Sequence, residues 1–165
     1  MRYWLIGGAV ALVFVLGCGC LFVILYPLAY KDEIVAAGEQ YDIQPALIAA
    51  LINAESSFDK NKVSKKGAVG LMQVMPTTAT YISKSNPDLF DAQTNIAVGV
   101  KYLAYLIAKF GDTTTALFAY NAGEGNVARW LKEQDVKQLT SCPFPETNAY
   151  VHKIQKTIKH YTWRI

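Results

Sequence analysis

The chain has few of the side chains that bind metals or form disulfides. Among its 165 residues there are three cysteines, at Cys18, Cys20 and Cys142, and two histidines, at His152 and His160. Cys142 is the one cysteine after position 30, so that part of the chain can form neither a disulfide nor a thiolate cluster. The histidines are eight positions apart, a poor metal-binding spacing. We therefore expect no metal site and no cofactor.

The chain also lacks a block of charge of one sign. All 13 acidic residues, and all of the 16 basic residues except Arg2, lie after position 30, which gives that part a net charge of +2. Its basic residues are not clustered, so nucleic acid is not an expected partner. A weak positive balance suits an anionic polymer or surface, although solubility accounts for it equally well.

No charged residue occurs between Tyr3 and Tyr30. The run YWLIGGAVALVFVLGCGCLFVILYPLAY is longer than the roughly 20 apolar residues with which a helix crosses a bilayer. Aromatic residues at both of its ends suit the two membrane interfaces. We therefore predict one N-terminal transmembrane helix and divide the chain into a membrane anchor, 1–30, and a second domain, 31–165. The lipid bilayer would be the partner of residues 3–30.

Two other interpretations of this run stay open. A cleaved signal peptide is disfavoured because the apolar core exceeds the roughly 7–15 residues of a signal sequence and no A-x-A-like site follows. Lipidation at Cys18, in the segment VLGC, is disfavoured because LFVILYPLAY would be an unusual start for a mature lipoprotein. Arg2 before the run and Lys31 after it give no strong indication of orientation.

Alternation of period two is almost absent from residues 31–165, apart from a few positions near VGLMQV. Apolar residues instead recur at three- and four-residue steps, and proline, glycine and polar stretches separate the segments. We expect the first helix to continue from the apolar run after Pro27, and Asp42 to cap the second. The pattern predicts a compact all-α domain of roughly seven short helices, over 31–41, 45–57, 76–83, 92–110, 114–121, 126–134 and 146–163.

Glu55 is the only charged residue in the apolar segment LIAALINAESSF. At helical spacing it is in register with Ile48, Leu51 and Ile52, on the side that should face a core. Such surroundings disfavour the charged carboxylate and raise its pKa, which a general acid working near neutral pH requires. The alternative is that Glu55 ends its helix in solvent, and position alone leaves both interpretations open.

Three further segments place polar side chains beside glycine, proline or aromatic residues: GAVGLMQVMP at 67–76, AYNAG at 119–123 and FPETNAYVHKI at 144–154. Each has an ordinary structural explanation. The first can be a glycine-rich turn, and Asn121 with Gly123 can form a helix C-cap. Glu146 can be a first-turn acid favoured by the helix dipole, and Tyr150 a core aromatic. None of them decides a function alone.

Taken in order, these segments resemble the catalytic domain of lytic transglycosylases of the soluble lytic transglycosylase (SLT) type. These are lysozyme-like muramidases, related in fold to goose-type lysozyme. The resemblance runs from about Glu33 to Lys159. No catalytic-motif position is altered, and residues 134–142 contain no motif. It rests on A-x-x-x-x-ESSF, S-x-KGA-x-GLMQ-x-MP-x-TA, N-I-x-x-G-x-x-YL, AYNAG-x-G-x-V and P-ET-x-x-YV-x-K-I. It implies a lysozyme-like helical fold for residues 31–165.

The resemblance also implies a role for each matching residue. Glu55 would be the catalytic acid and then the base, and Ser56 would contact substrate or steady the glutamate. Tyr150 would reach the catalytic carboxyl through its hydroxyl, and Glu146 would be a supporting residue. Substrate contacts in the cleft would come from Gly70, Leu71, Met72, Gln73, Tyr120 and Asn121.

Most glycosidases need two carboxylates. The other acidic residues here fall mostly in polar loops or exposed turns, and none shares the apolar setting of Glu55. One carboxyl suffices where the substrate supplies the nucleophile. In lytic transglycosylases the glutamate protonates the oxygen between N-acetylmuramic acid and N-acetylglucosamine and then deprotonates the muramyl C6 hydroxyl, which closes to a 1,6-anhydro product. The N-acetyl group, Gln73 and Asn121 would meet the developing positive charge.

The sequence therefore predicts a membrane-anchored lytic transglycosylase that acts on peptidoglycan glycan strands. It would be a single-pass protein of the bacterial cytoplasmic membrane, with the catalytic domain on the outer, cell-wall side. Two alternatives remain. A hydrolytic muramidase, like goose-type lysozyme, would use the same site with water as the nucleophile. A non-catalytic wall-binding module would keep only the fold, and the intact Glu55 argues against it.

Overall fold

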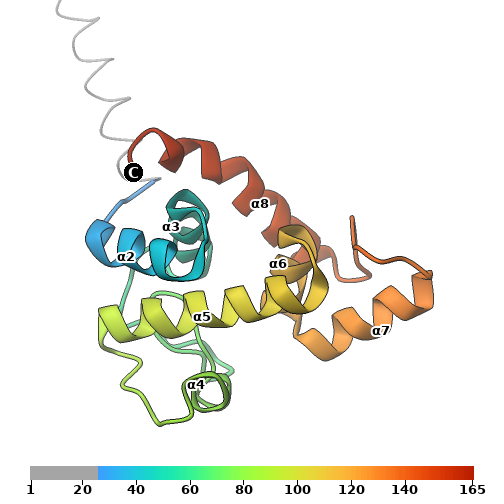
Figure 1. The fold of residues 1–165 in the computed structure, drawn as a ribbon, viewed down its shortest axis with the longest axis horizontal. Coiled ribbons are helices and arrows are strands. Elements are labelled where there is room, and N and C mark those ends of the chain that lie inside the picture. The colour runs from blue at the N-terminus through green and yellow to red at the C-terminus, as the bar shows by residue number, and fades with distance from the viewer. Residues whose placement is uncertain (1–25) are drawn as a thin grey trace, which may run out of the picture.

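The computed structural model describes residues 26–165 of the chain. This part is helical almost throughout (Figure 1), and its only β pairing consists of isolated bridges that join Val69 to Val63 and to Val74. The predicted all-α class is therefore confirmed. The helices of the described part are α2 (Lys31–Tyr41), α3 (Pro45–Glu55), α4 (Pro76–Ser83), α5 (Ala92–Phe110), α6 (Thr113–Ala122), α7 (Glu124–Gln134) and α8 (Pro145–Thr162).

The predicted membrane anchor, residues 1–30, lies outside the described residues except for positions 26–30. None of the helices between positions 26 and 165 combines the length and the apolar character needed to cross a bilayer. Residues 27–30 are not helical, and Tyr30 has a left-handed φ of 57°. The expectation that α2 continues from the apolar run after Pro27 was therefore wrong, because the chain turns at Tyr30 before α2 begins.

The junction between α2 and α3 is a tight reversal at Asp42. Asp42 has a φ of 53°, and its backbone N–H donates to Gly38 O, so this residue ends α2 instead of capping α3 as expected. A Cβ at Gly38 would lie 2.6 Å from Ile43 O, which explains the glycine. Pro45 then begins α3, where its missing N–H costs no helical hydrogen bond.

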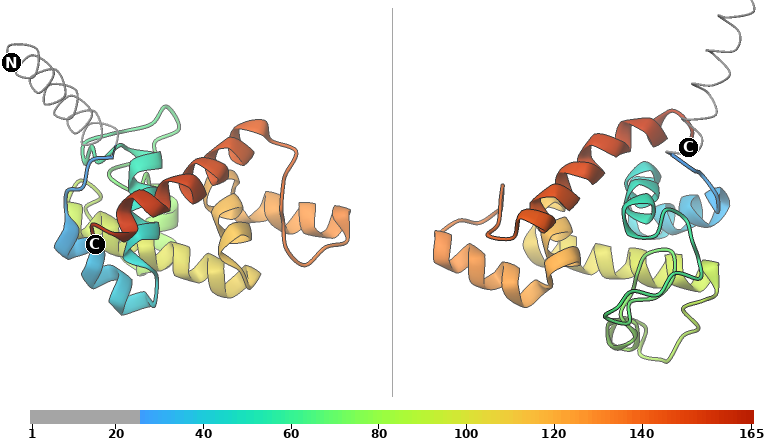
Figure 2. Two further views of the ribbon diagram at one scale, coloured as in Figure 1. Left: turned by 90° about the horizontal axis from the view of Figure 1, so that it is seen from above. Right: turned by 180° about the vertical axis from the view of Figure 1, so that it is seen from behind.

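The centre of the domain is α3, since eight of its 11 residues are buried. It packs against α2 and α8, while α5 packs against α2, α4 and α6. In Figure 1, α8 runs above α3 and α6, and α5 runs beneath them. Figure 2 shows α7 projecting at the end of the domain away from α2. The C-terminal end of α3, with Glu55, therefore lies within the helical framework instead of on a loop.

Buried Asn95 of α5 fixes the segment that joins α3 to α4. Its Nδ2 donates to Val69 O and to Leu89 O, each at 2.9 Å, and its Oδ1 accepts from Met72 N at 2.9 Å. Gly70 has a φ of 79°, and a Cβ there would collide with Asn95 Nδ2. A side chain at position 70 would displace this clamp, so the glycine is required by both space and backbone conformation.

The two ends of the described chain are bound to each other. Tyr161 Oη donates to Pro27 O at 3.0 Å, and Arg164 Nη1 donates to Tyr26 O at 2.6 Å. In return, Lys31 Nζ donates to Arg164 O at 2.8 Å. Figure 1 shows the C-terminus beside the start of the described chain. The last turn of α8 therefore clamps residues 26–31.

Candidate active site

Glu55 is the last residue of α3, and its carboxyl is held against α8. Tyr150 Oη donates a hydrogen bond to Glu55 Oε1 at 2.5 Å, across 95 positions of sequence. Burial raises the pKa of Glu55 to about 7, although the Tyr150 bond and the charges of Lys62 and Lys153 lower it. The predicted rise in the pKa of Glu55 is therefore present, and the group can hold a proton near neutral pH.

The environment of this carboxyl is cationic instead of acidic. Lys62 and Lys153 are the charged groups with the largest effect on its pKa, and no second carboxylate among residues 26–165 has a comparable effect. Lys62 Nζ donates to the backbone oxygen of Glu55 and not to the carboxyl. Glu146 lies exposed in the first turn of α8, and no hydrogen bond or ion pair found in residues 26–165 joins it to Glu55. The site thus contains one carboxyl and not a pair.

Tyr120 of α6 lies near Glu55 and bonds to the segment between α3 and α4. Its Oη donates to Met72 O at 2.9 Å. Burial raises the pKa of Tyr120, and the nearby charge of Glu55 raises it further. Burial likewise raises the pKa of Tyr150. Both phenols therefore stay neutral at physiological pH and act through hydrogen bonds only.

A cleft of about 320 Å³ opens beside Tyr120. Its walls come from the segment before α4, from α4 and α5, and from the end of α6. Three of the residues predicted to bind substrate, Gln73, Tyr120 and Asn121, line it. The other lining residues include Lys66, Thr78 and Tyr102. Two motifs that are far apart in the sequence, GAVGLMQVMP and AYNAG, are thus brought to one cavity. Glu55 and Tyr150 do not line it, but Glu55 lies close enough to Tyr120 for its charge to raise the pKa of Tyr120.

Gln73 lines this cleft, and both hydrogens of its side-chain amide are bound to the backbone. Its backbone has a φ of 47°, and its side-chain Nε2 donates to Lys62 O at 3.0 Å and to Gly70 O at 2.9 Å. Because both amide hydrogens are used in this way, the atom available to a ligand is Oε1. This oxygen suits a ligand that carries a hydrogen-bond donor or develops positive charge.

The remaining predicted substrate contacts lie below the surface. The side chains of Ser56, Leu71 and Met72 are 4%, 0% and 0% exposed. Ser56 Oγ donates to Leu71 O at 2.7 Å, and Gly70 is fixed by the Asn95 clamp. These side chains are out of reach of a ligand, so a direct substrate contact through them does not fit this structure. Of the two roles left open for Ser56, only that of steadying Glu55 agrees with its burial, and it would act through the bonds that Ser56 Oγ makes to Ile52 O and Leu71 O.

Sequence reasoning missed Tyr102, Lys62 and Lys153. The Tyr102 ring lies 5.3 Å from the Tyr120 ring and lines the cleft, and burial raises the pKa of Tyr102 to about 12. The signal for Tyr102 was its place in N-I-x-x-G-x-x-YL, a motif from which no site residue was predicted. The two lysines gave no signal, because exposed lysines on polar segments are usually solvated.

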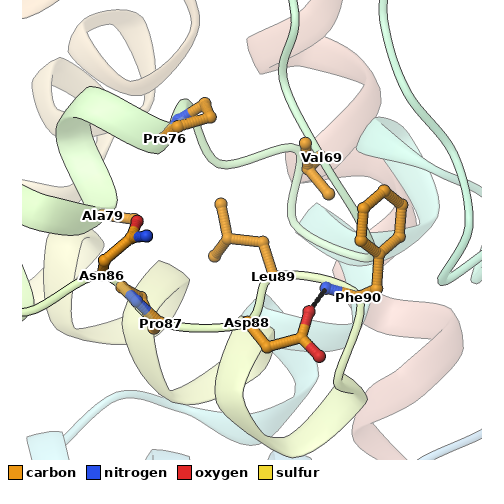
Figure 3. A pocket seen from close by; sticks show the side chains of 8 residues that line it. All are labelled: Val69, Pro76, Ala79, Asn86, Pro87, Asp88, Leu89 and Phe90. Carbon is orange, nitrogen blue, oxygen red and sulfur yellow. Dashed lines mark hydrogen bonds between the residues drawn. The ribbon is translucent and has the colours of Figure 1, made fainter.

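A second cavity, of about 230 Å³, lies between α4 and the segment 86–90 (Figure 3). Leu89 stands at its centre, and its lining is mostly apolar. Asp88 Oδ1 accepts from Phe90 N at 2.9 Å, so this carboxylate serves the local turn. No residue predicted for the site lies in this cavity.

The sequence matches the family model of the transglycosylase SLT domain over residues 32–140. The chain belongs to this family. It is 38% identical over 143 residues to the soluble lytic murein transglycosylase of Salmonella typhimurium, covering 78% of this chain and 22% of that protein. It is 33% identical over 165 residues to the membrane-bound lytic murein transglycosylase C of Edwardsiella ictaluri, covering 80% of this chain and 46% of that protein.

Solved structures of the SLT family have the same fold. The 70 kDa soluble lytic transglycosylase of Escherichia coli superimposes with a TM-score of 0.77 at 33% identity, over 84% of this chain and 25% of that one. The family and the fold predicted from the motifs are therefore confirmed. The chain spans about a quarter of the soluble relatives and about half of the membrane-bound one.

Proposed function

We propose that this chain is a peptidoglycan lytic transglycosylase in which Glu55 is the catalytic acid and then the base. The observation that carries the proposal is the half-buried Glu55 carboxyl, with a pKa of about 7 and Tyr150 Oη at 2.5 Å. A related lytic transglycosylase of Pseudomonas aeruginosa, with a TM-score of 0.74 and 29% identity, is described as an inactive mutant in which glutamate is replaced by glutamine. That description agrees with an essential glutamate.

In the first step, the protonated Glu55 carboxyl donates its proton to the oxygen that links N-acetylmuramic acid to N-acetylglucosamine. The bond from that oxygen to C1 of the muramyl residue breaks, and positive charge develops at C1. The cleft-lining Gln73 would turn Oε1 toward this charge, because its amide hydrogens are held by Lys62 O and Gly70 O. Asn121 lines the same cleft and would add a second polar contact.

In the second step, the Glu55 carboxylate takes the proton of the muramyl C6 hydroxyl, and O6 bonds to C1. The product is a 1,6-anhydro ring, the proton is back on Glu55, and no water is consumed. The Tyr150 hydrogen bond and the charges of Lys62 and Lys153 favour the carboxylate that exists between the steps. Burial favours the protonated acid that begins the cycle. Burial and the polar contacts therefore each stabilise one of the two protonation states that Glu55 needs.

The test is a digest of purified peptidoglycan, analysed by mass spectrometry, with wild type and Glu55→Gln in parallel. Wild type should release anhydro-muropeptides, and Glu55→Gln should lose about 10³-fold in rate while it still folds. Full activity of Glu55→Gln would refute the mechanism. Reducing ends, heavier by one water, would identify a hydrolytic muramidase instead.

The proposal includes a membrane anchor formed by the uncharged run before Tyr26, with the domain on the cell-wall side of the bacterial cytoplasmic membrane. Residues 26–30, which were predicted to belong to the anchor, are instead non-helical and bound to the C-terminal end of the domain. This part of the proposal is supported by the uncharged run and by the name of the membrane-bound relative from Edwardsiella ictaluri. The full chain should stay in membranes washed at alkaline pH. Protease added to spheroplasts should degrade residues 31–165, and full protection would refute this orientation.

A further inference from the structure

Four tyrosine rings form a continuous row that begins in the cleft and leaves it. The ring centres of Tyr120 and Tyr102 are 5.3 Å apart, those of Tyr102 and Tyr105 are 6.2 Å apart, and those of Tyr105 and Tyr81 are 6.0 Å apart. Tyr120 and Tyr102 line the cleft. Tyr105 and Tyr81 lie beyond it, and the proposed reaction does not use them.

The outer pair continues the two walls of the cleft. Tyr105 lies three positions after Tyr102 on α5, and Tyr81 lies three positions after Thr78 on α4. Residues three apart on a helix share a face, so each outer tyrosine stands one turn beyond a residue that lines the cleft. Because α4 and α5 pack against each other, the two rings meet where the cleft ends.

Polar contacts at its hydroxyl hold the Tyr105 ring in place. Tyr105 Oη donates to Glu124 Oε2 at 3.1 Å, and Lys109 Nζ forms an ion pair with the same oxygen at 2.7 Å. Tyr81 is 54% exposed, and Lys84 Nζ lies 4.4 Å from its ring centre. An exposed aromatic surface that adjoins a binding cleft is characteristic of an interaction site.

We propose that Tyr105 and Tyr81 form a distal saccharide-binding subsite, on which a pyranose ring of the glycan strand stacks after it leaves the cleft. The inference rests on the proposed function, because the strand in the cleft is the occupant that reaches these rings. The C–H face of a pyranose is apolar and electropositive, and it therefore pairs with the negative face of an aromatic ring. The fixed Tyr105 ring reduces the entropy lost on binding.

The test compares long glycan strands with a short fragment, a tetrasaccharide. Tyr81→Ala removes the more exposed ring, whereas Tyr81→Trp keeps an aromatic face. With long strands, Tyr81→Ala should lower kcat/KM about three- to tenfold, mainly through KM. With the tetrasaccharide its kcat/KM should equal that of wild type. Tyr81→Trp should restore the rate on long strands.

Phe90→Ala is the matched control, because Phe90 is also an exposed aromatic, at 49%, but lines the second cavity. It should leave the rates on both substrates unchanged. The subsite is refuted if Tyr81→Ala has no effect on long strands, or if it loses as much on the tetrasaccharide. An equal loss on long strands in Phe90→Ala would refute it too.

A binding measurement separates the subsite from the proposed function. Wild type that is inactive on both substrates would refute the function, whereas active wild type without a length effect of Tyr81→Ala would refute the subsite alone. Cosedimentation of Glu55→Gln with insoluble peptidoglycan gives a readout without turnover. Adding Tyr81→Ala to Glu55→Gln should weaken that binding about three- to tenfold. Unchanged binding would refute the subsite whatever the activity.

Discussion

Two glutamates of this chain each accept a hydrogen bond from a tyrosine hydroxyl, yet their pKa values move in opposite directions. Glu55 accepts from Tyr150, and burial raises its pKa to about 7. Glu124 accepts from Tyr105 and is bonded to Lys109, and the Lys109 bond lowers its pKa. Since both pairs contain a tyrosine, desolvation and the position of the lysine decide which carboxyl can act as an acid.

The position of the lysine differs in a specific way. Lys109 Nζ bonds directly to the Glu124 carboxylate at 2.7 Å. Lys62 Nζ bonds to the backbone oxygen of Glu55, so its charge reaches the carboxyl only through space. A direct ion pair at Glu55 would have favoured the carboxylate and removed the proton that the first step needs. The comparison can be tested by replacing each glutamate, and then its tyrosine partner, in the same way at the two positions.

Replacing each glutamate by glutamine should give the largest contrast. Glu55→Gln removes the proton donor and should lower the rate of anhydro-muropeptide release about 10³-fold. Glu124→Gln removes the exposed ion pair with Lys109 and should change this rate less than about twofold. Initial rates on the same purified peptidoglycan measure both. Comparable losses in the two variants would mean that burial does not single out the acid.

Replacing each tyrosine by phenylalanine should give a smaller contrast. Tyr150→Phe removes a hydrogen bond to a group that is charged between the two steps, and we expect about a tenfold lower rate. Because that bond lowers the pKa of Glu55, its loss should move the alkaline limb of the pH–rate profile to higher pH. Tyr105→Phe removes the matching bond at Glu124 and should leave the pH–rate profile where it is, because Tyr105 does not contact Glu55. An alkaline limb that moves to lower pH in Tyr150→Phe would contradict this assignment.

Unfolding experiments should separate the two glutamates by the sign of their pH dependence. The pKa of Glu55 rises from 4.5 to about 7 on folding. Between these values the folded chain holds the extra proton, so stability falls as pH rises through this window, by about 3 kcal/mol in all. Glu55→Gln removes this cost and should be more stable than wild type at pH 8, with a difference that disappears near pH 4.5.

The matched variant Glu124→Gln should behave in the opposite way. The pKa of Glu124 is lowered in the folded chain, so its stabilisation is present above the unfolded value and is lost as pH falls through the folded value. Glu124→Gln should therefore be slightly less stable than wild type at pH 8. Urea unfolding of both variants at pH 4.5 and pH 8 measures the two signs. If both variants changed the stability at pH 8 in the same direction, the environments of Glu55 and Glu124 would not differ as described.

The smallest expected effect is that of Lys109→Met. Both partners of its ion pair are well exposed, at 39% and 38%, so the change should lower the free energy of unfolding by about 0.5 kcal/mol. Screening should abolish the difference at high salt. Urea unfolding at low and high ionic strength measures it. A loss that is independent of salt would mean that the lysine acts by packing on Tyr105.

The sequence was most informative where a long apolar period has clear ends. Both ends of the segment 92–110 were predicted correctly, because Gly111 ends the helix and its apolar spacing is regular. The end of α3 was predicted two residues late. Ser57 and Phe58 adopt φ values of 55° and 67°, a left-handed conformation that a bulky residue such as Phe58 rarely takes. Tertiary packing imposes that turn, and no local pattern indicates it.

For the site, the limits were different. The contact between Glu55 and Tyr150 joins α3 to α8, and it came from the resemblance because spacing says nothing about two residues 95 positions apart. The resemblance did not reveal that Ser56 and Met72 are buried, since motifs identify positions and not exposure. Tyr105 was missed because a tyrosine at helical spacing is usually a packing residue.

The clamp between the two ends of the described chain limits how far the Glu55 carboxyl can lie from residue 26. Tyr150 lies eleven positions before Tyr161, which holds Pro27, so the two are about 17 Å apart along α8 at about 1.5 Å per residue. Because α8 is a continuous helix, it is a rigid connection between the clamp and the catalytic site. If the uncharged run before Tyr26 crosses a bilayer, as proposed, the catalytic site would reach only the layer of wall closest to the membrane. Inserting flexible residues before Tyr26 would let the catalytic site reach wall farther from the membrane. Inserting them after residue 31 would not, because residues 26–31 would still be bound to the end of the chain.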